Sequence, residues 1–151
     1  MLTARIGFLI TSSLIIQPIS TNLVLAADDA GARLTNAQSL KCHFGPATIA
    51  KWKDNETNIS SAEYDADVQF DSIDLGKSTA RIIGKVAAGD VTATISGIGL
   101  TFVEAATAVV DTTTVFATYT DNHEFPAVES RHALFGQAMA EQFYGTCKIW
   151  Q

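Results

Sequence analysis

The stretch "DVTATIS" (90–96) decides the fold class, because apolar and polar side chains alternate along it. In an extended strand, Val91, Ala93 and Ile95 fall on one face, and the threonines and Ser96 fall on the other. One face of such a strand is buried and the other contacts water. The stretch therefore predicts a half-buried β-strand.

Similar segments flank this strand on both sides, separated by turn residues about every ten positions. Connections such as "AAGD" (87–90) and "SGIG" (96–99) suit tight hairpins, because glycine tolerates a positive φ. Short connections require antiparallel neighbours. We therefore predict an all-β fold: an antiparallel up-and-down meander that closes into a small, lipocalin-like barrel or curls into a sandwich. The expected strands span 64–74, 79–86, 90–96, 99–105, 112–119 and 125–134.

Three places interrupt the regular alternation. The apolar phase shifts after Phe70, and a β-bulge near Asp71 and Ser72 explains the shift. A turn is expected near 110–111. The stretch "LFGQAMAEQ" (134–142) loses strand periodicity, which leaves open a short helix near 135–142.

The first 26 residues have the pattern of a signal peptide, with Arg5, an apolar core at 6–16 and small residues before Ala26. Polar residues break the apolar run, which is too short for the roughly 20 residues of a spanning helix. We predict cleavage after Ala26, no membrane attachment afterwards, and a periplasmic or secreted protein. Residues 27–36 are expected to form a flexible leader before a single β domain at 37–151.

The chain has two cysteines, Cys42 and Cys147, which lie near the two ends of the predicted β domain. Each lies among inward-facing residues of a terminal strand, and these strands are neighbours in a closed meander. An oxidising compartment favours a disulfide, whereas a zinc site needs four ligands and only His43 lies beside either cysteine. We predict a structural disulfide, with a redox or metal role as the alternative, and no cofactor.

The chain is acidic, with sixteen acidic and ten basic residues and a formal net charge of −6. Nucleic acids and anionic membranes bind basic surfaces, so both are excluded as partners. A basic protein would suit this surface. Asn55 and Asn58 begin glycosylation sequons, which matter only in a eukaryotic secretory pathway. An acidic run lacks the glycine-centred loop of calcium motifs; it comprises Glu63, Asp65, Asp67, Asp71 and Asp74.

The segment "ESRH" (129–132) holds the most suggestive polar side chains. In a strand, Ser130 and His132 share one face, and Glu129 and Arg131 share the other. If the first face points inward, Ser130 and His132 line a ligand site. The alternative is an exposed Glu129–Arg131 pair beside a hydrogen-bonded histidine. A hydrolase built on Ser130 and His132 ranks lower, because the sequence lacks a Gly-x-Ser-x-Gly elbow.

Several stretches of the chain resemble small exported β-proteins of proteobacteria, a resemblance that implies a compartment and no activity. They are "FDSIDLGKSTARIIG", "GLTFVE", "TTVFA", "AVESRH" and "FYGTCKIW". In architecture the chain is similar to MliC-type periplasmic lysozyme inhibitors, which are acidic barrels with a disulfide. Their inhibitory loop reads Ser-Gly-x-x-Tyr, whereas "SGIGL" (96–100) has Leu100 in place of the tyrosine.

Together these patterns predict a monomeric, non-enzymatic binding module. Its ligand is either a small apolar molecule in the interior or a protein on the rim. The alternative is an exported inhibitor of a basic enzyme such as lysozyme.

Overall fold

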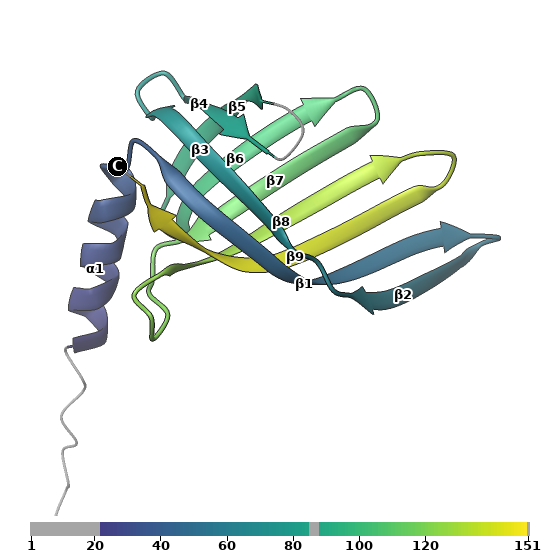
Figure 1. Ribbon diagram of the computed structural model, residues 1–151, viewed down its shortest axis with the longest axis horizontal. Helices are drawn as coiled ribbons and strands as arrows, with labels where there is room; N and C mark the ends of the chain where they lie inside the picture. Colours follow the sequence, from purple (N-terminus) through teal and green to yellow (C-terminus); the bar gives the residue numbers. More distant parts are fainter. Residues whose placement is uncertain (1–21, 85–87, 151) are drawn as a thin grey trace, which may run out of the picture.

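The computed structural model describes residues 22–84 and 88–150. Within these residues one helix precedes nine strands, which form a single antiparallel sheet in the order β2-β1-β3-β4-β5-β6-β7-β8-β9. Because β1 also pairs with β9, β1 and β3 to β9 close into an eight-stranded barrel (Figure 1). The elements are α1 (Asn22–Thr35), β1 (Leu40–Lys53), β2 (Glu56–Ala62), β3 (Ala66–Asp74), β4 (Thr79–Ile83), β5 (Ala88–Ser96), β6 (Gly99–Ala106), β7 (Val109–Phe116), β8 (Phe125–Leu134) and β9 (Ala138–Ile149).

The closed barrel confirms the predicted all-β meander, since β3 to β9 follow one another around the sheet. β2 is a departure from this order, because it pairs with the distal half of β1 at the edge of the sheet. The two strands form a hairpin that projects beyond the barrel (Figure 1). Its two-residue loop places Asp54 and Asn55 at positive φ (52° and 65°), as the tight turns that suit right-twisted hairpins require.

The seam between β1 and β9 closes the barrel. Cys42 and Cys147 lie directly opposite each other across it, and a disulfide joins them, with their Cα atoms 4.0 Å apart. This confirms the predicted pairing. Nearby, the two backbones approach so closely that a Cβ at Gly145 would lie 2.0 Å from the carbonyl oxygen of His43. Glycine at 145 is therefore required for the seam to form.

Helix α1 lies at the end of the barrel where β1 begins and β9 ends (Figure 1). Ala30 and Leu34, four residues apart on one helix face, are fully buried in the barrel core, and Gly31 packs near Ala117. The flexible leader predicted for 27–36 is therefore wrong, because these apolar side chains cover a barrel end that would otherwise contact water. We call this the α1 end.

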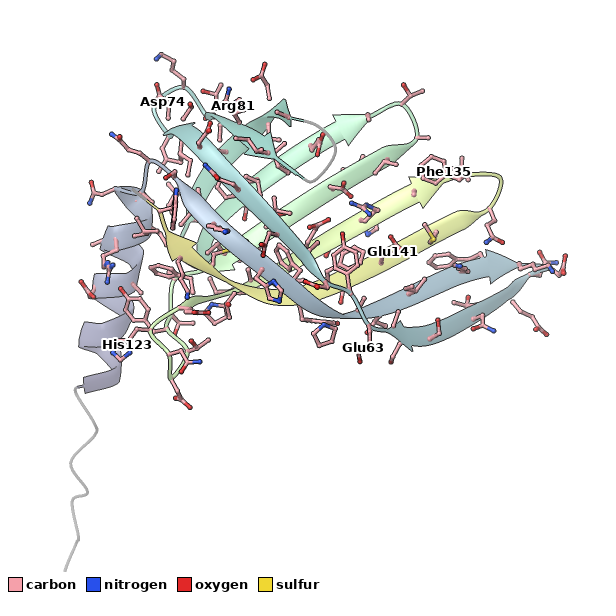
Figure 2. The ribbon with its side chains drawn as sticks, viewed as in Figure 1. Glu63, Asp74, Arg81, His123, Phe135 and Glu141 are labelled. Atoms are coloured by element: carbon pink, nitrogen blue, oxygen red, sulfur yellow. A yellow bond between two sulfur atoms is a disulfide. The ribbon has the colours of Figure 1, made fainter. Side chains whose placement is uncertain are left out.

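The opposite end, where the β6–β7 and β8–β9 hairpins turn, is the far end. Figure 2 shows Phe135 at the tip of the β8–β9 hairpin and His123 beside α1 at the other end. The predicted signal peptide falls mainly at 1–21, outside the described residues, and its last five residues begin α1. The described part of the chain has no helix with the length and hydropathy needed to cross a bilayer.

The β-bulge predicted near Asp71 and Ser72 is confirmed. The pairing of β3 with β4 shifts between Asp71 and Asp74, and Ser72 has a φ of 52°.

The turn expected near 110–111 is wrong, because β7 already begins at Val109 and pairs with β6 from there. Asp111 is therefore a strand residue and not a turn residue.

The short helix left open near 135–142 is also absent, because β9 begins at Ala138. Residues 135–137 form the hairpin loop between Leu134 and Ala138, and Gly136 there has a φ of 78°. Over this stretch β9 pairs with β8 on one side and with β1 on the other. Two ladders of backbone hydrogen bonds outweigh the helix preference of Ala138 and Met139.

Candidate functional site

Strand β8 turns its predicted ligand residues outward. Phe125, Ala127 and Glu129 are buried on the inner face, whereas Ser130 is half-buried and His132 is exposed on the outer face. The prediction that Ser130 and His132 line the interior is therefore wrong. The apolar side chains of Phe125 and Ala127 determine which face of β8 is buried. Glu129 and Arg131 lie on the same face and therefore also point inward.

His132 instead borders a shallow groove on the outside of the barrel. This groove has a volume of about 510 Å³ and is lined mainly by apolar side chains, including Trp52, Val110, Leu134 and Met139. The structure thus places His132 beside apolar residues and not beside a carboxylate.

The interior of the barrel holds a partly open cavity of about 430 Å³ toward the far end. We call it the far-end cavity. It has two chemically different walls, and Tyr64 lies between them at the start of β3. The apolar wall, from β3 to β6, comprises Val68, Phe70, Ile82, Val91 and Phe102; the charged wall, from β6 to β8, comprises Glu104, Asp111, Thr113, Glu129 and Arg131.

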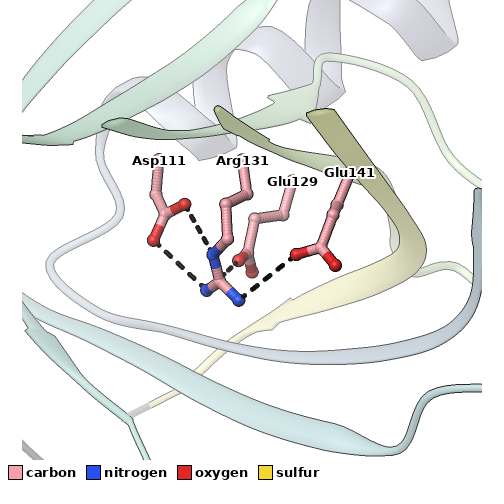
Figure 3. A network of polar contacts seen from close by, with 4 residues as sticks. All are labelled: Asp111, Glu129, Arg131 and Glu141. Atoms are coloured by element: carbon pink, nitrogen blue, oxygen red, sulfur yellow. Dashed lines mark hydrogen bonds and ion pairs between the residues drawn. The ribbon is translucent and has the colours of Figure 1, made fainter. Parts of the chain in front are cut away.

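Arg131 is the centre of the charged wall (Figure 3). Its Nε donates to Oδ1 of Asp111 at 2.9 Å, and its Nη2 donates to Oδ2 of Asp111 and to Oε1 of Glu129, both at 3.2 Å. Its Nη1 lies 3.8 Å from Oε2 of Glu141. Strand register produces this arrangement, because Asp111 on β7 and Glu141 on β9 are the direct cross-strand partners of Arg131.

The Glu129 carboxyl group is a buried acid of the cavity wall. It is only 6% exposed, and burial raises its pKa from 4.5 to about 6. Arg131 opposes the increase, while the nearby carboxylates of Asp111, Glu104 and Glu141 add to it. Glu129 is therefore mostly ionised at pH 7 and becomes neutral in mildly acidic solution.

Tyr64 and Phe143 flank the charged wall. Their rings are 4.3 Å apart, and the Arg131 guanidinium lies 5.4 Å from the centre of the Phe143 ring. Burial, and next the charge of Glu129, raise the pKa of Tyr64 above its ordinary value. The phenol therefore stays protonated at neutral pH and keeps its hydrogen available for donation.

Two polar side chains of the charged wall can accept hydrogen bonds from a bound molecule. Thr113 is 4% exposed and lines the cavity, and its hydroxyl carries acceptor lone pairs. Glu104 also lines the cavity, and its carboxylate forms no ion pair with any described residue. This wall can therefore accept hydrogen-bond donors from a bound molecule.

Sequence reasoning missed most of this site. Asp111 was expected in a turn, Glu141 fell within the stretch left open to a helix, and Glu129 and Arg131 were expected on the surface. A signal existed, because Glu129 and Arg131 continue the alternation of Phe125 and Ala127. Extending that phase by two more inward positions would have placed both charges inside the barrel.

The acidic run of 63–74 lies mainly on the outer surface and pairs with basic residues. Arg81 contacts Asp71 at 2.8 Å, and Lys77 contacts Asp74 at 2.7 Å. Hydrogen bonds from these partners lower the pKa of both carboxyls. Among the described residues, no cluster of three or more histidine, cysteine or acidic side chains could hold a metal ion.

The stretch "SGIGL", compared above with the inhibitory loop, lies at the α1 end. Residues 97 and 98 form the turn between β5 and β6, and Leu100, at the tyrosine position of the loop pattern, is fully buried in the core. A buried leucine cannot contact a protein partner.

No model of a known protein family matches this chain, and no curated protein matches it. The roles of the cavity residues therefore have to be argued from their geometry.

Proposed function

We propose that the protein is a non-enzymatic binding module that holds a small molecule in the far-end cavity. The volume and the lining of the cavity support this proposal. Its volume of about 430 Å³ falls in the range of small-molecule sites, which are mostly apolar concavities with a few convergent polar groups. The apolar and charged walls supply both features.

The apolar wall offers a hydrophobic surface for part of the ligand. The rings of Phe70 and Phe102 stack on each other at 3.8 Å with an angle of 6° between their planes. Both residues line the cavity beside Val68, Ile82 and Val91. An apolar or aromatic ligand moiety would displace water from this wall, which is favourable.

The cavity lining favours binding over hydrolysis. Within the part of the chain that the structure describes, the lining contains no serine, cysteine or histidine, and its carboxylates Asp111 and Glu129 are bound to Arg131. The disulfide and the closed barrel make the frame rigid, which lowers the entropic cost of ligand binding. The disulfide is also compatible with an oxidising location, in the periplasm or outside the cell.

A pair of glycine variants tests the proposal. Gly89 lines the cavity, its φ lies outside the left-handed region, and a Cβ there would meet only ordinary contacts, the nearest at 3.6 Å from Glu104. We expect Gly89→Leu to fill the cavity without breaking the fold. Gly97 lies exposed in the β5–β6 turn, and a Cβ there would meet nothing within 4 Å. Gly97→Leu is therefore the matched control.

The measurement is a fluorescence titration of the purified protein with the neutral apolar dye N-phenyl-1-naphthylamine, with thermal unfolding checked by circular dichroism. We expect the wild type and Gly97→Leu to bind the dye with equal affinity, and Gly89→Leu to bind it at least about tenfold more weakly. Equal binding by Gly89→Leu, or no binding by the wild type, would reject the cavity as the site.

A further inference from the structure

The charges in the far-end cavity do not balance. Among the described residues, four acidic residues line it, Asp67, Glu104, Asp111 and Glu129, together with a single cation, Arg131. Glu141 adds a fifth carboxylate 3.8 Å from the same guanidinium. Such an excess of negative charge inside the barrel is costly unless a positive charge enters the cavity.

Arg131, the one cation among the described lining residues, is already engaged. The Arg131 guanidinium donates three hydrogen bonds to Asp111 and Glu129 and approaches Glu141 from its remaining side. An anionic ligand would have to displace these carboxylates and then remain beside them. The wall therefore disfavours carboxylates and phosphates, although it contains an arginine.

The acceptors, in contrast, are still available. Within the described residues, Glu104 has no ion pair, and Arg131 contacts only Oε1 of Glu129. Thr113 is a buried residue of the same wall, and its hydroxyl can also accept a hydrogen bond. A group that donates several hydrogen bonds and carries a positive charge matches these three acceptors.

We propose that the ligand of the far-end cavity is an amphiphilic organic cation, such as a primary amine or a guanidine attached to an apolar or aromatic body. Its charged group lies against Glu104, Glu129 and Thr113, and its apolar body lies against the stacked rings of Phe70 and Phe102. This inference rests on the proposed function, because it assigns the ligand class of the same cavity.

Three probes with one naphthalene ring test the ligand class: 1-naphthylmethylamine as the cation, 1-naphthalenemethanol as the neutral compound and 1-naphthoate as the anion. Binding to the purified protein is measured by calorimetry at pH 7.5. We expect the cation to bind at least about tenfold more tightly than the alcohol, and the anion to bind most weakly.

Two variants that each remove one negative charge test whether the preference for the cation arises in the cavity. Glu104→Gln removes a carboxylate from the cavity, whereas Glu56→Gln removes one at the exposed base of the β1–β2 hairpin loop. We expect Glu104→Gln to reduce the preference for the cation over the alcohol about fivefold or more. Glu56→Gln should behave as the wild type.

Each result bears on one of the two proposals. Equal binding of the three probes, or preference for the alcohol, overturns the cationic ligand class and leaves the binding module intact. The same reduction in Glu104→Gln and Glu56→Gln also overturns it, because the preference would then come from the net charge of the protein. If no probe binds, and the neutral dye does not bind either, the proposed function itself fails.

Discussion

The two ends of the barrel are built from opposite kinds of side chain. At the α1 end the interior is filled with apolar residues, the disulfide crosses the seam, and Leu34 of α1 is fully buried against them. At the far end the interior holds a cavity whose described lining includes four acidic residues and one arginine. One sheet of continuous strands runs through both ends, so the difference lies in the side chains and not in the backbone.

We assign the stability of the fold mainly to the α1 end, and the proposed ligand binding to the far end. Burial of apolar side chains and closure of the seam stabilise the fold at the α1 end. Burial of an ionised carboxyl at the far end opposes folding, as the raised pKa of Glu129 indicates. A group that costs stability and contacts a cavity is better explained by ligand binding than by packing.

The largest effect is expected at the seam. Cys42 and Cys147 are separated by 105 residues in sequence, and closing a loop of this length contributes about 4.7 kcal/mol in the chain-entropy treatment. We expect the double variant Cys42→Ala/Cys147→Ala to lose most of this free energy of unfolding, measured by urea denaturation. A loss below about 1 kcal/mol would mean that the packing of β1 on β9 closes the barrel without the bond.

Leu34 and Leu134 allow the same substitution to be compared at a buried and at an exposed position. Leu34 is 0% exposed at the α1 end, and Leu134 is 65% exposed at the far end. We expect Leu34→Ala to lower the free energy of unfolding by about 3 kcal/mol, because it leaves a cavity under the helix. The matched variant Leu134→Ala should change it by less than about 0.5 kcal/mol. Similar losses in both would show that α1 does not contribute to the core.

The third prediction concerns the stability cost of Glu129. Its pKa of about 6 in the fold exceeds the 4.5 of an exposed glutamate, so the folded state binds the proton more tightly. The free energy of unfolding therefore falls as pH rises from 4.5 to 6, and the decrease reaches about 2 kcal/mol above pH 6. Glu129→Gln keeps an acceptor for Arg131 without the charge.

We expect Glu129→Gln to be more stable than the wild type at pH 8 and about equal to it at pH 4, measured by urea denaturation at both values. The surface variant Glu56→Gln is the control and should show no such pH-dependent gain. A variant less stable than the wild type at pH 8 would mean that the Arg131 ion pair outweighs the burial cost.

The smallest effect is the pH dependence of cation binding. We expect the affinity for 1-naphthylmethylamine to fall roughly fivefold between pH 7.5 and pH 5, because Glu129 becomes protonated. The decrease should be smaller in Glu129→Gln and absent for the neutral alcohol. An affinity independent of pH would remove Glu129 from the binding site. The charged or titratable groups around Glu129 are Tyr64 before β3, Glu104 on β6, Asp111 on β7, Arg131 on β8 and Glu141 on β9.

Predictions from the sequence were accurate for the seam between β1 and β9 and inaccurate for α1 and for the far end. The inward faces of the first and last strands, including Cys42 and Cys147, were correctly predicted and are buried. At the far end the inward positions of Glu129 and Asp111 carry charged side chains, so for Glu129 only the phase set by Phe125 and Ala127 indicates an inward position. Their burial depends on Arg131, which reaches them only after β7, β8 and β9 have paired.

The sequence alone determined the strand periodicity, the bulge at Ser72 and the cysteine pair, because alternation and turn chemistry are local properties. Only the tertiary structure decided that α1 covers one end, that β9 extends to Ala138 as a strand, and that the far end encloses charges. Each of these depends on partners distant in sequence. Burial and ladder hydrogen bonds from those partners outweigh local preferences of a fraction of a kcal/mol per residue.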